Sequence, residues 1–315
     1  MKGVKEGQRP LSLVVICGPT AGGKTSLALD LAEHFGVEIV SADSRQVYRG
    51  MDIGTAKASV EERAKVRHHL IDVVDPNENF TASDFIVYGR VALNDIADRS
   101  HLPLVVGGTG FYVDALLRGL VDAPGADPAL RQELADWELQ HGSGSLHTRL
   151  QAVDPVMAAR LTPLDQVRII RALEVYYQSG QRLSDLQGRH AAVKSPYRVL
   201  SIGLASQRDL LYDRINQRVD EMIQAGLLNE VQALLEQGYN PDLKALKTIG
   251  YQECVNHLLG NASLPDTISL IQRNSRRYAK RQLTWFRKNK DIIWLDSPRE
   301  FAKVLKLIDH FIMSK

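Results

Sequence analysis

The stretch that most constrains the fold is an apolar run that leads directly into a glycine-rich loop. Residues 11–17 read LSLVVIC, which is typical of a strand buried on both faces of a parallel sheet. The loop GPTAGGKT follows at 18–25, and apolar residues then recur at helical spacing from Ala28 to Phe35, before Gly36. A strand, a tight loop and an amphipathic helix in succession predict an α/β fold with a parallel sheet wrapped by helices.

The loop fits the pattern Gly-x-x-x-x-Gly-Lys-Thr, in which backbone N–H groups hold phosphate oxygens. Its members are Gly18, Pro19, Thr20, Ala21, Gly22, Gly23, Lys24 and Thr25. The Lys24 charge and the following helix N-terminus favour an anion, and the Thr25 hydroxyl can reach a magnesium ion. The strand before the loop and the helix after it supply the context that a phosphate site requires. Since most such loops hold a nucleoside triphosphate, the loop by itself indicates a kinase.

Strands and helices continue to alternate after the loop. Further strands are predicted at 37–44, 68–74, 102–110, 197–204 and 292–295. Thr81 predicts the cap of a helix, with Asp84 three residues on. Ligands of parallel sheets bind at the carboxyl ends of the strands. That edge would bring together the glycine-rich loop, Asp43 and the turn at 107–110.

The strand signal disappears between about 119 and 195. Asp127-Pro128 and Thr162-Pro163 each combine a capping residue with a proline suited to the first helical position, so two helices are predicted to start there. Gly180 would end the second. We therefore expect a core of residues 1–118 and 197–315, with a helical insertion at 119–196.

Asp43 and Thr109 are the polar candidates at the strand ends. Asp43 can ligate magnesium, act as a general base or cap a turn. Asp52 and Asp72 are weaker rivals, because Asp52 resembles a turn residue and Asp72 lies within a predicted strand. Thr109 can donate or accept one hydrogen bond in GGTG, which can equally be a plain turn between a strand and a helix.

Residues 268–290 carry eight lysines and arginines and no acidic residue, with aromatic residues interleaved. Arg277, Lys280 and Arg281 belong to one face of the predicted helix. A solvated surface helix usually mixes charge signs, so this one favours a nucleic-acid backbone as partner.

Composition excludes several classes of protein. The chain has no apolar run long enough for a membrane span, and LSLVVIC enters the loop directly, so the N-terminal residues 1–10 are not read as a secretory signal. The two cysteines, Cys17 and Cys254, suit buried free thiols better than a disulfide or zinc framework. No heptad pattern is present. We expect a cytoplasmic monomer.

The sequence resembles the tRNA dimethylallyltransferases, also called tRNA isopentenyltransferases. The resemblance rests on VVICGPTAGGKT, SADSRQVYRGMDIGTAK, HHLIDVVDPNENFTASDF, LPLVVGGTGFYVDALLRGL, RIIRALEVYYQSG, LKTIGYQE and AKRQLTWFRK. These motifs span nearly the whole chain in order, and DSRQVYRGMDIGTAK is far more specific than the glycine-rich loop. Eukaryotic members often add a C-terminal zinc finger, and this chain resembles the compact bacterial form.

The resemblance implies a core like that of the P-loop NTPases, with a loop that holds the diphosphate of dimethylallyl diphosphate. The allyl group would pass to N6 of adenosine 37 in the tRNA anticodon loop, with release of pyrophosphate. Lys24 and Mg²⁺, the latter ligated by Thr25, would stabilise the leaving group. Asp43 matches the family's catalytic aspartate, and Thr109 matches a residue near the reacting centre and the RNA.

The resemblance also implies a set of tRNA contacts, to which the basic helix adds three residues. The set is Asp43, Ser44, Arg45, Gln46, Thr109, Arg131, Val167, Arg168, Ile169, Ile170, Arg171, Lys247, Thr248, Ile249, Gly250, Tyr251, Gln252, Arg277, Lys280 and Arg281. The target base must leave its stack to enter the pocket. Three alternatives stay open: a metabolite kinase, a prenyltransferase of free adenine nucleotides, and a non-catalytic RNA-binding module.

Overall fold

The computed structural model describes residues 10–296 and 300–314. The chain divides into two compact units, unit 1 with residues 1–117 and 196–315, and unit 2 with residues 118–195. Each unit contains its own hydrophobic core. Most of the segment 1–10, which the sequence did not mark as a secretory signal, lies outside the described residues.

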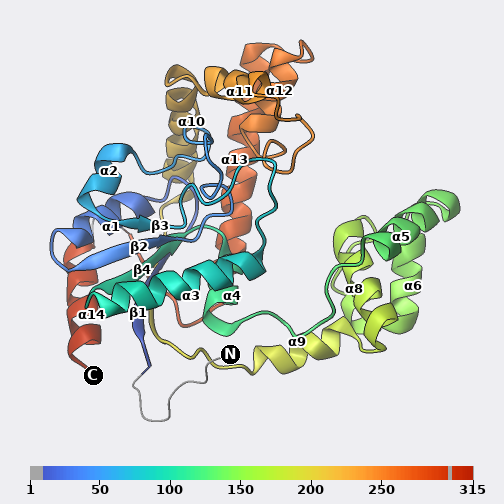
Figure 1. Cartoon of the computed structure of the whole chain (residues 1–315), viewed down its shortest axis with the longest axis horizontal. Helices are drawn as coiled ribbons and strands as arrows, with labels where there is room; N and C mark the ends of the chain where they lie inside the picture. Colours follow the sequence, from blue (N-terminus) through green and yellow to red (C-terminus); the bar gives the residue numbers. More distant parts are fainter. Residues whose placement is uncertain (1–9, 297–299, 315) are drawn as a thin grey trace. The chain divides into compact units, whose positions relative to one another are not determined.

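A parallel sheet forms the centre of unit 1, with the strand order β3-β2-β4-β1-β5-β6 (Figure 1). The strands are β1 Ser12–Cys17, β2 Val37–Ser41, β3 His68–His69, β4 Leu102–Gly107, β5 Arg198–Leu204 and β6 Ile293–Leu295. Cys17 at the end of β1 pairs with Gly107 on one side and Gly203 on the other, so these strands end level. The predicted parallel sheet is confirmed.

The prediction of a strand over 68–74 was wrong beyond its first two residues. Only His68 and His69 pair with β2. Leu70 and Asp72 have φ angles of 63° and 56°, which lie in the left-handed region and break an extended strand.

Helices cover both faces of the sheet because the side chains of β1 alternate between two cores. Leu13 and Val15 face the core that includes the helices α3 (Ala82–Asp98) and α13 (Leu264–Phe286), whereas Val14 and Ile16 face the core that includes α1 (Lys24–Ala32) and α14 (Phe301–Met313). In Figure 1 the red C-terminal helix α14 lies beside the blue helix α1. The helices that lie in unit 1 or end at its boundary are α1 Lys24–Ala32, α2 Val60–Lys65, α3 Ala82–Asp98, α4 Gly110–Arg118, α10 Arg208–Gln224, α11 Leu227–Glu236, α12 Tyr251–Leu258, α13 Leu264–Phe286 and α14 Phe301–Met313.

Unit 2 is helical throughout its regular elements. These are α5 Pro128–His141, α6 Ser145–Val153, α7 Pro155–Ala158, α8 Gln166–Ser179 and α9 Leu183–Ala191. The predicted cap at Asp127 is confirmed, but the predicted start at Thr162 was wrong, because Asp165 N–H donates to Thr162 O in a turn that precedes α8. Gly180 ends α8 as predicted.

A buried carboxylate organises the core side of α5 and α8. Glu174 has a fully buried side chain and accepts hydrogen bonds from Arg131 Nε at 2.7 Å, Arg171 NH1 at 2.6 Å and Asp127 N at 2.7 Å. Burial by itself would raise the pKa of Glu174, but these donors outweigh it and lower the pKa to about 2. One anion therefore holds both arginines in place.

Candidate active site at the carboxyl end of the sheet

The glycine-rich loop connects β1 to α1 and points Lys24 into a cavity. Gly23, with φ of 84°, takes the left-handed conformation that lets the chain turn into α1 at Lys24. Lys24 Nζ donates to Pro19 O at 2.7 Å and to Gly18 O at 3.2 Å. Burial, helped by the nearby Arg218 guanidinium, lowers the pKa of Lys24 to about 8. A bound anion would restore the charged form.

Asp43 follows β2 and has two roles in the structure. Its Oδ1 accepts a hydrogen bond from Arg45 N at 2.8 Å, so the turn-capping interpretation is correct. Asp43 also lines the cavity that contains Lys24 and Thr25. A carboxylate has two oxygens, and the turn bond occupies one of them. The turn role and a chemical role are therefore compatible.

Thr109 follows β4 and ties the two neighbouring turns together. Its Oγ1 accepts a hydrogen bond from Ser44 N at 3.2 Å, and its N–H donates to Ala42 O at 3.2 Å. The Tyr278 phenol from α13 lies near the Thr109 side chain, and burial raises the pKa of Tyr278 to about 12. Asp43 and Thr109 are thus brought to one edge, as the sheet topology predicted.

Two adjoining cavities meet at Asp43. The first, of about 100 Å³, lies over the loop and is lined by Lys24, Thr25 and His68. The second, of about 320 Å³, is lined by Arg45, Thr248 and Arg281 among others. Both are lined by a shared set of residues, which comprises Thr20, Asp43, Thr55, Ala56, Arg218 and Tyr278. The geometry places a smaller chamber over the glycine-rich loop beside a larger chamber with a basic rim.

Among the lining residues that sequence reasoning missed, three reach the cavities from helices far along the chain. Arg218 on α10 contacts the Thr20 hydroxyl at 3.5 Å, and burial lowers the pKa of this guanidinium. Tyr278 and Gln282 lie one turn apart on α13, on its sheet-facing side. The spacing of Tyr278 and Gln282, four residues apart, was a signal that both lie on one helix face. It was overlooked because the basic residues dominate the pattern of α13. For Arg218 no local pattern distinguishes it from its charged neighbours.

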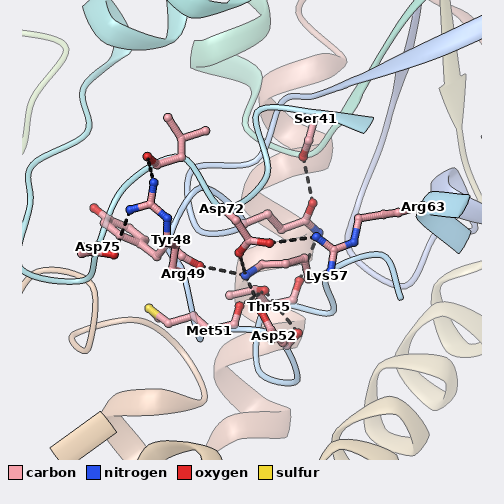
Figure 2. A network of polar contacts seen from close by, with 12 residues as sticks. Ser41, Tyr48, Arg49, Met51, Asp52, Thr55, Lys57, Arg63, Asp72 and Asp75 are labelled. Carbon is pink, nitrogen blue, oxygen red and sulfur yellow. Dashed lines mark hydrogen bonds and ion pairs between the residues drawn. The ribbon is translucent and has the colours of Figure 1, made fainter. Parts of the chain in front are cut away.

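A network of hydrogen bonds and ion pairs connects the segment 43–57 to its surroundings (Figure 2). The Lys57 side chain is 1% exposed and its Nζ donates to Tyr48 O at 2.8 Å, to Asp72 at 2.6 Å and to Asp52. Glu230 from α11 accepts hydrogen bonds from the backbone of residues 52–54. Asp52 and Asp72 therefore stabilise the loop that supplies the cavity wall, which leaves Asp43 as the candidate base.

The predicted tRNA contacts differ in accessibility. Arg277, Lys280 and Arg281 are exposed on α13. Exposed or cavity-lining positions at 247–252 are Lys247, Thr248, Ile249, Gly250 and Gln252. Tyr251 is fully buried, and its hydroxyl donates to Glu230 Oε1 at 2.5 Å. Its side chain supports the loop instead of facing a partner.

In unit 2, Val167 and Arg168 are exposed and Ile170 is half-buried. Ile169 is fully buried in the core of the unit, so the prediction that it contacts RNA fails for its side chain. Arg131 and Arg171 keep exposed fractions of 44% and 32% while paired with Glu174. Both arginines therefore have a structural role, as partners of a buried carboxylate.

Other kinds of site find no support in the part of the chain that the structure describes. Cys17 and Cys254 are buried free thiols, and burial raises the pKa of each to about 12. Residues 10–296 and 300–314 contain no cluster of three His, Cys, Asp or Glu side chains that would hold a metal by themselves. Within the same ranges, no helix has both the length and the apolar character needed to cross a membrane.

Comparisons with known proteins agree with one another. The model of the family described as IPP transferase matches residues 46–289. The tRNA dimethylallyltransferase 1 of Syntrophotalea carbinolica is 62% identical over 95% of this chain and 96% of its own length. The tRNA dimethylallyltransferase of Geobacter metallireducens is 52% identical, over 95% and 97%.

Solved structures show the same relationship. The full-length tRNA isopentenylpyrophosphate transferase from Bacillus halodurans superimposes with a TM-score of 0.72 at 41% identity, covering 96% of this chain and 97% of that one. A eukaryotic dimethylallyltransferase that acts on tRNA gives a TM-score of 0.82 at 29% identity, over 96% and 80% of the two chains.

Proposed function

The chain belongs to the tRNA dimethylallyltransferase family, and we propose that its two adjoining cavities transfer the allyl group of dimethylallyl diphosphate to tRNA. The observation that carries this assignment is the position of Asp43 in the wall shared by the smaller chamber and the larger chamber. The acceptor is N6 of adenosine 37 in the anticodon loop. The enzyme acts as a monomer in the cytoplasm.

The smaller chamber holds the leaving group. Cleavage of the allylic C–O bond leaves negative charge on the diphosphate, and Lys24, Arg218 and loop N–H groups lie where they stabilise it. The Thr25 hydroxyl and the Asp43 carboxylate line this chamber and are hard oxygen donors, which suits Mg²⁺. Mg²⁺ bound by Thr25 and the diphosphate would neutralise charge on the leaving group.

The larger chamber receives the flipped adenine. The N6 nitrogen of the adenine forms the new bond to the allyl carbon as the C–O bond to the diphosphate breaks, and the N6 proton passes to Asp43. The Thr109 hydroxyl, held by Ser44 N–H and near Tyr278, orients the reacting groups at the junction. Arg45, Lys247 and Arg281 line this chamber with positive charge, as a phosphate backbone requires.

Unit 2 supplies a second set of proposed RNA contacts. Val167 and Arg168 are exposed on α8, while Arg131 and Arg171 stay partly exposed in their pairs with Glu174. We assign these side chains to the tRNA stem, since the chambers of unit 1 accommodate the target base itself.

The decisive experiment mixes the protein with dimethylallyl diphosphate and an unmodified anticodon stem-loop. Pyrophosphate release matched by a gain in RNA mass supports the proposal. Consumption of ATP without prenyl transfer would identify a metabolite kinase. Prenylation of AMP in preference to the stem-loop would identify a nucleotide prenyltransferase.

Binding of pyrophosphate should weaken as the pH rises through 8. A phosphate anion favours the charged form of Lys24, whose pKa in the free protein is about 8. Affinity is therefore highest below this pH and falls by up to about tenfold per pH unit above it, until the raised pKa of the complex is reached. Calorimetry from pH 7 to 9.5 tests this expectation. The Lys24→Met variant should bind more weakly with a flat profile, and an unchanged slope in that variant would assign the dependence to another group.

Neutralising the exposed basic face of α13 should weaken RNA binding and reduce its dependence on salt. Removing one bound phosphate from the interface lowers the slope of log affinity against log salt by about 0.7 for single-stranded RNA. The double change Arg277→Gln, Lys280→Gln removes two such charges. Filter binding at several salt concentrations measures the slope. Lys65→Gln with Lys306→Gln removes the same charge from α2 and α14 and should leave it unchanged.

A further inference from the structure

Gln282 connects two loops of the site that are far apart in the sequence. It lies on α13 and is 6% exposed. Its Oε1 accepts a hydrogen bond from Thr20 N at 2.8 Å, and its Nε2 donates to Gly108 O at 3.0 Å. Thr20 belongs to the glycine-rich loop after β1, and Gly108 to the turn after β4. A single side-chain amide therefore spans the gap between these loops.

The local sequence is adapted to this contact. A Cβ atom on Gly108 would lie 2.1 Å from Gln282 Nε2, so the amide approaches the turn only because residue 108 is glycine. An amide is the side-chain group that offers an acceptor on one atom and a donor on another in one plane. Since both ends are bonded and the residue is buried, Gln282 is held in one orientation.

The bond from Thr20 N to Gln282 shows that one expectation about the glycine-rich loop was wrong. The N–H groups of the loop were expected to point at phosphate oxygens, yet the Thr20 N–H donates to Gln282. This bond commits Thr20 to orienting the loop. The diphosphate must therefore rely on other loop N–H groups, together with Lys24 and Arg218.

We propose that Gln282 is a positioning residue of the transfer reaction, which fixes the spacing between the glycine-rich loop and the turn that carries Thr109. This inference rests on the proposed function. The loop holds the leaving group and the turn lies where the acceptor reacts, so their separation sets the distance between the breaking C–O bond and the incoming N6. Misplacement of reacting groups by 1 Å costs about 100-fold in rate.

Gln282→Leu removes both hydrogen bonds while keeping a side chain of comparable length. It should lower the single-turnover rate about 30-fold, within the range that such misplacement causes. Pyrophosphate affinity should change little, because Lys24, Thr25 and Arg218 remain. Calorimetric stoichiometry gives the fraction of folded protein, by which the rate is corrected. Gln272→Leu is the matched control. Gln272 lies on the same helix, and its amide donates to Asn216 O and Asp220 Oδ1 of α10.

Gln282→Glu supplies a test that does not depend on tolerance of leucine. The ionised carboxylate can accept from Thr20 N–H, but it repels Gly108 O and the diphosphate. The protonated form again offers an acceptor and a donor, as glutamine does. The ratio of the Gln282→Glu rate to the wild-type rate should therefore rise as pH falls from 8.5 to 5.5, whereas the ratio for Gln282→Leu should stay flat.

A flat ratio for Gln282→Glu, or a wild-type rate for Gln282→Leu, overturns the inference. A loss for Gln282→Leu that vanishes after correction for folded protein also overturns it, because the role would then be structural only. Failure of the proposed function has a different signature, since the wild-type protein itself would then release no pyrophosphate with the stem-loop.

Discussion

Replacing Asp43 with asparagine is expected to lower the single-turnover rate by about 1,000-fold, the middle of the range for loss of a general base. Asparagine keeps an oxygen that can accept the hydrogen bond from Arg45 N, so the turn after β2 survives. It cannot take the N6 proton. RNA affinity should therefore stay close to that of the wild type, while the chemical step is lost.

Single-turnover kinetics with excess protein separates these two effects, and filter binding with the stem-loop gives the affinity. Asp52→Asn is the comparison variant, because Asp52 is a carboxylate of the same loop that pairs with Lys57. Its rate should fall far less. A wild-type rate in Asp43→Asn would remove the base assignment, and an equal loss in both variants would show that the loop rather than the proton transfer was damaged.

Replacing Glu174 with alanine is expected to lower the free energy of unfolding of unit 2 by about 3 kcal/mol. The change leaves two arginines and the Asp127 N–H without their common acceptor. Because the arginines are partly exposed, water can hydrate them once Glu174 is gone. The expected loss of unfolding free energy therefore lies at the low end for a broken buried pair. Urea unfolding followed by circular dichroism measures it.

Glu133→Ala removes the same charge from an exposed position on α5 and should change stability by much less. The loss of stability in acid provides a second measurement of the role of Glu174. The pKa of Glu174 is about 2 in the folded protein against 4.5 for the free side chain, so its stabilisation is complete above 4.5 and disappears as pH falls toward 2. Equal acid sensitivity in Glu174→Ala and wild type would contradict this.

The sequence predicted those parts of the site that follow from local pattern and from one rule about parallel sheets. The strand and loop around Lys24 were recognisable because period and glycine spacing are local properties. Asp43 and Thr109 were placed together because strands of a parallel sheet end at a common edge. These two inferences needed no knowledge of how distant segments pack.

The residues that were missed depend on contacts between distant segments. Arg218 and Gln282 reach the loop from helices far along the chain. No local pattern marks Arg218, and the helical spacing that could have marked Gln282 is dominated by the basic residues of α13. The pairing of Arg131 with the buried Glu174 joins two helices 43 residues apart in the sequence and appears only after folding, whereas Arg171 lies three residues from Glu174 on the same helix. The misplaced start of α8 has a local cause, since a proline after threonine serves a turn as well as a helix.

The position of β5 in the sheet determines the order in which the protein can fold during synthesis. β1 lies between β4 and β5, yet all of unit 2 is translated between those two strands. Unit 2 is a helical body with its own core and mostly local contacts, a type that folds quickly. We expect it to be complete while β1 still has an open edge, so unit 2 can fold before Arg218, Tyr278 and Gln282 are translated and close the smaller cavity.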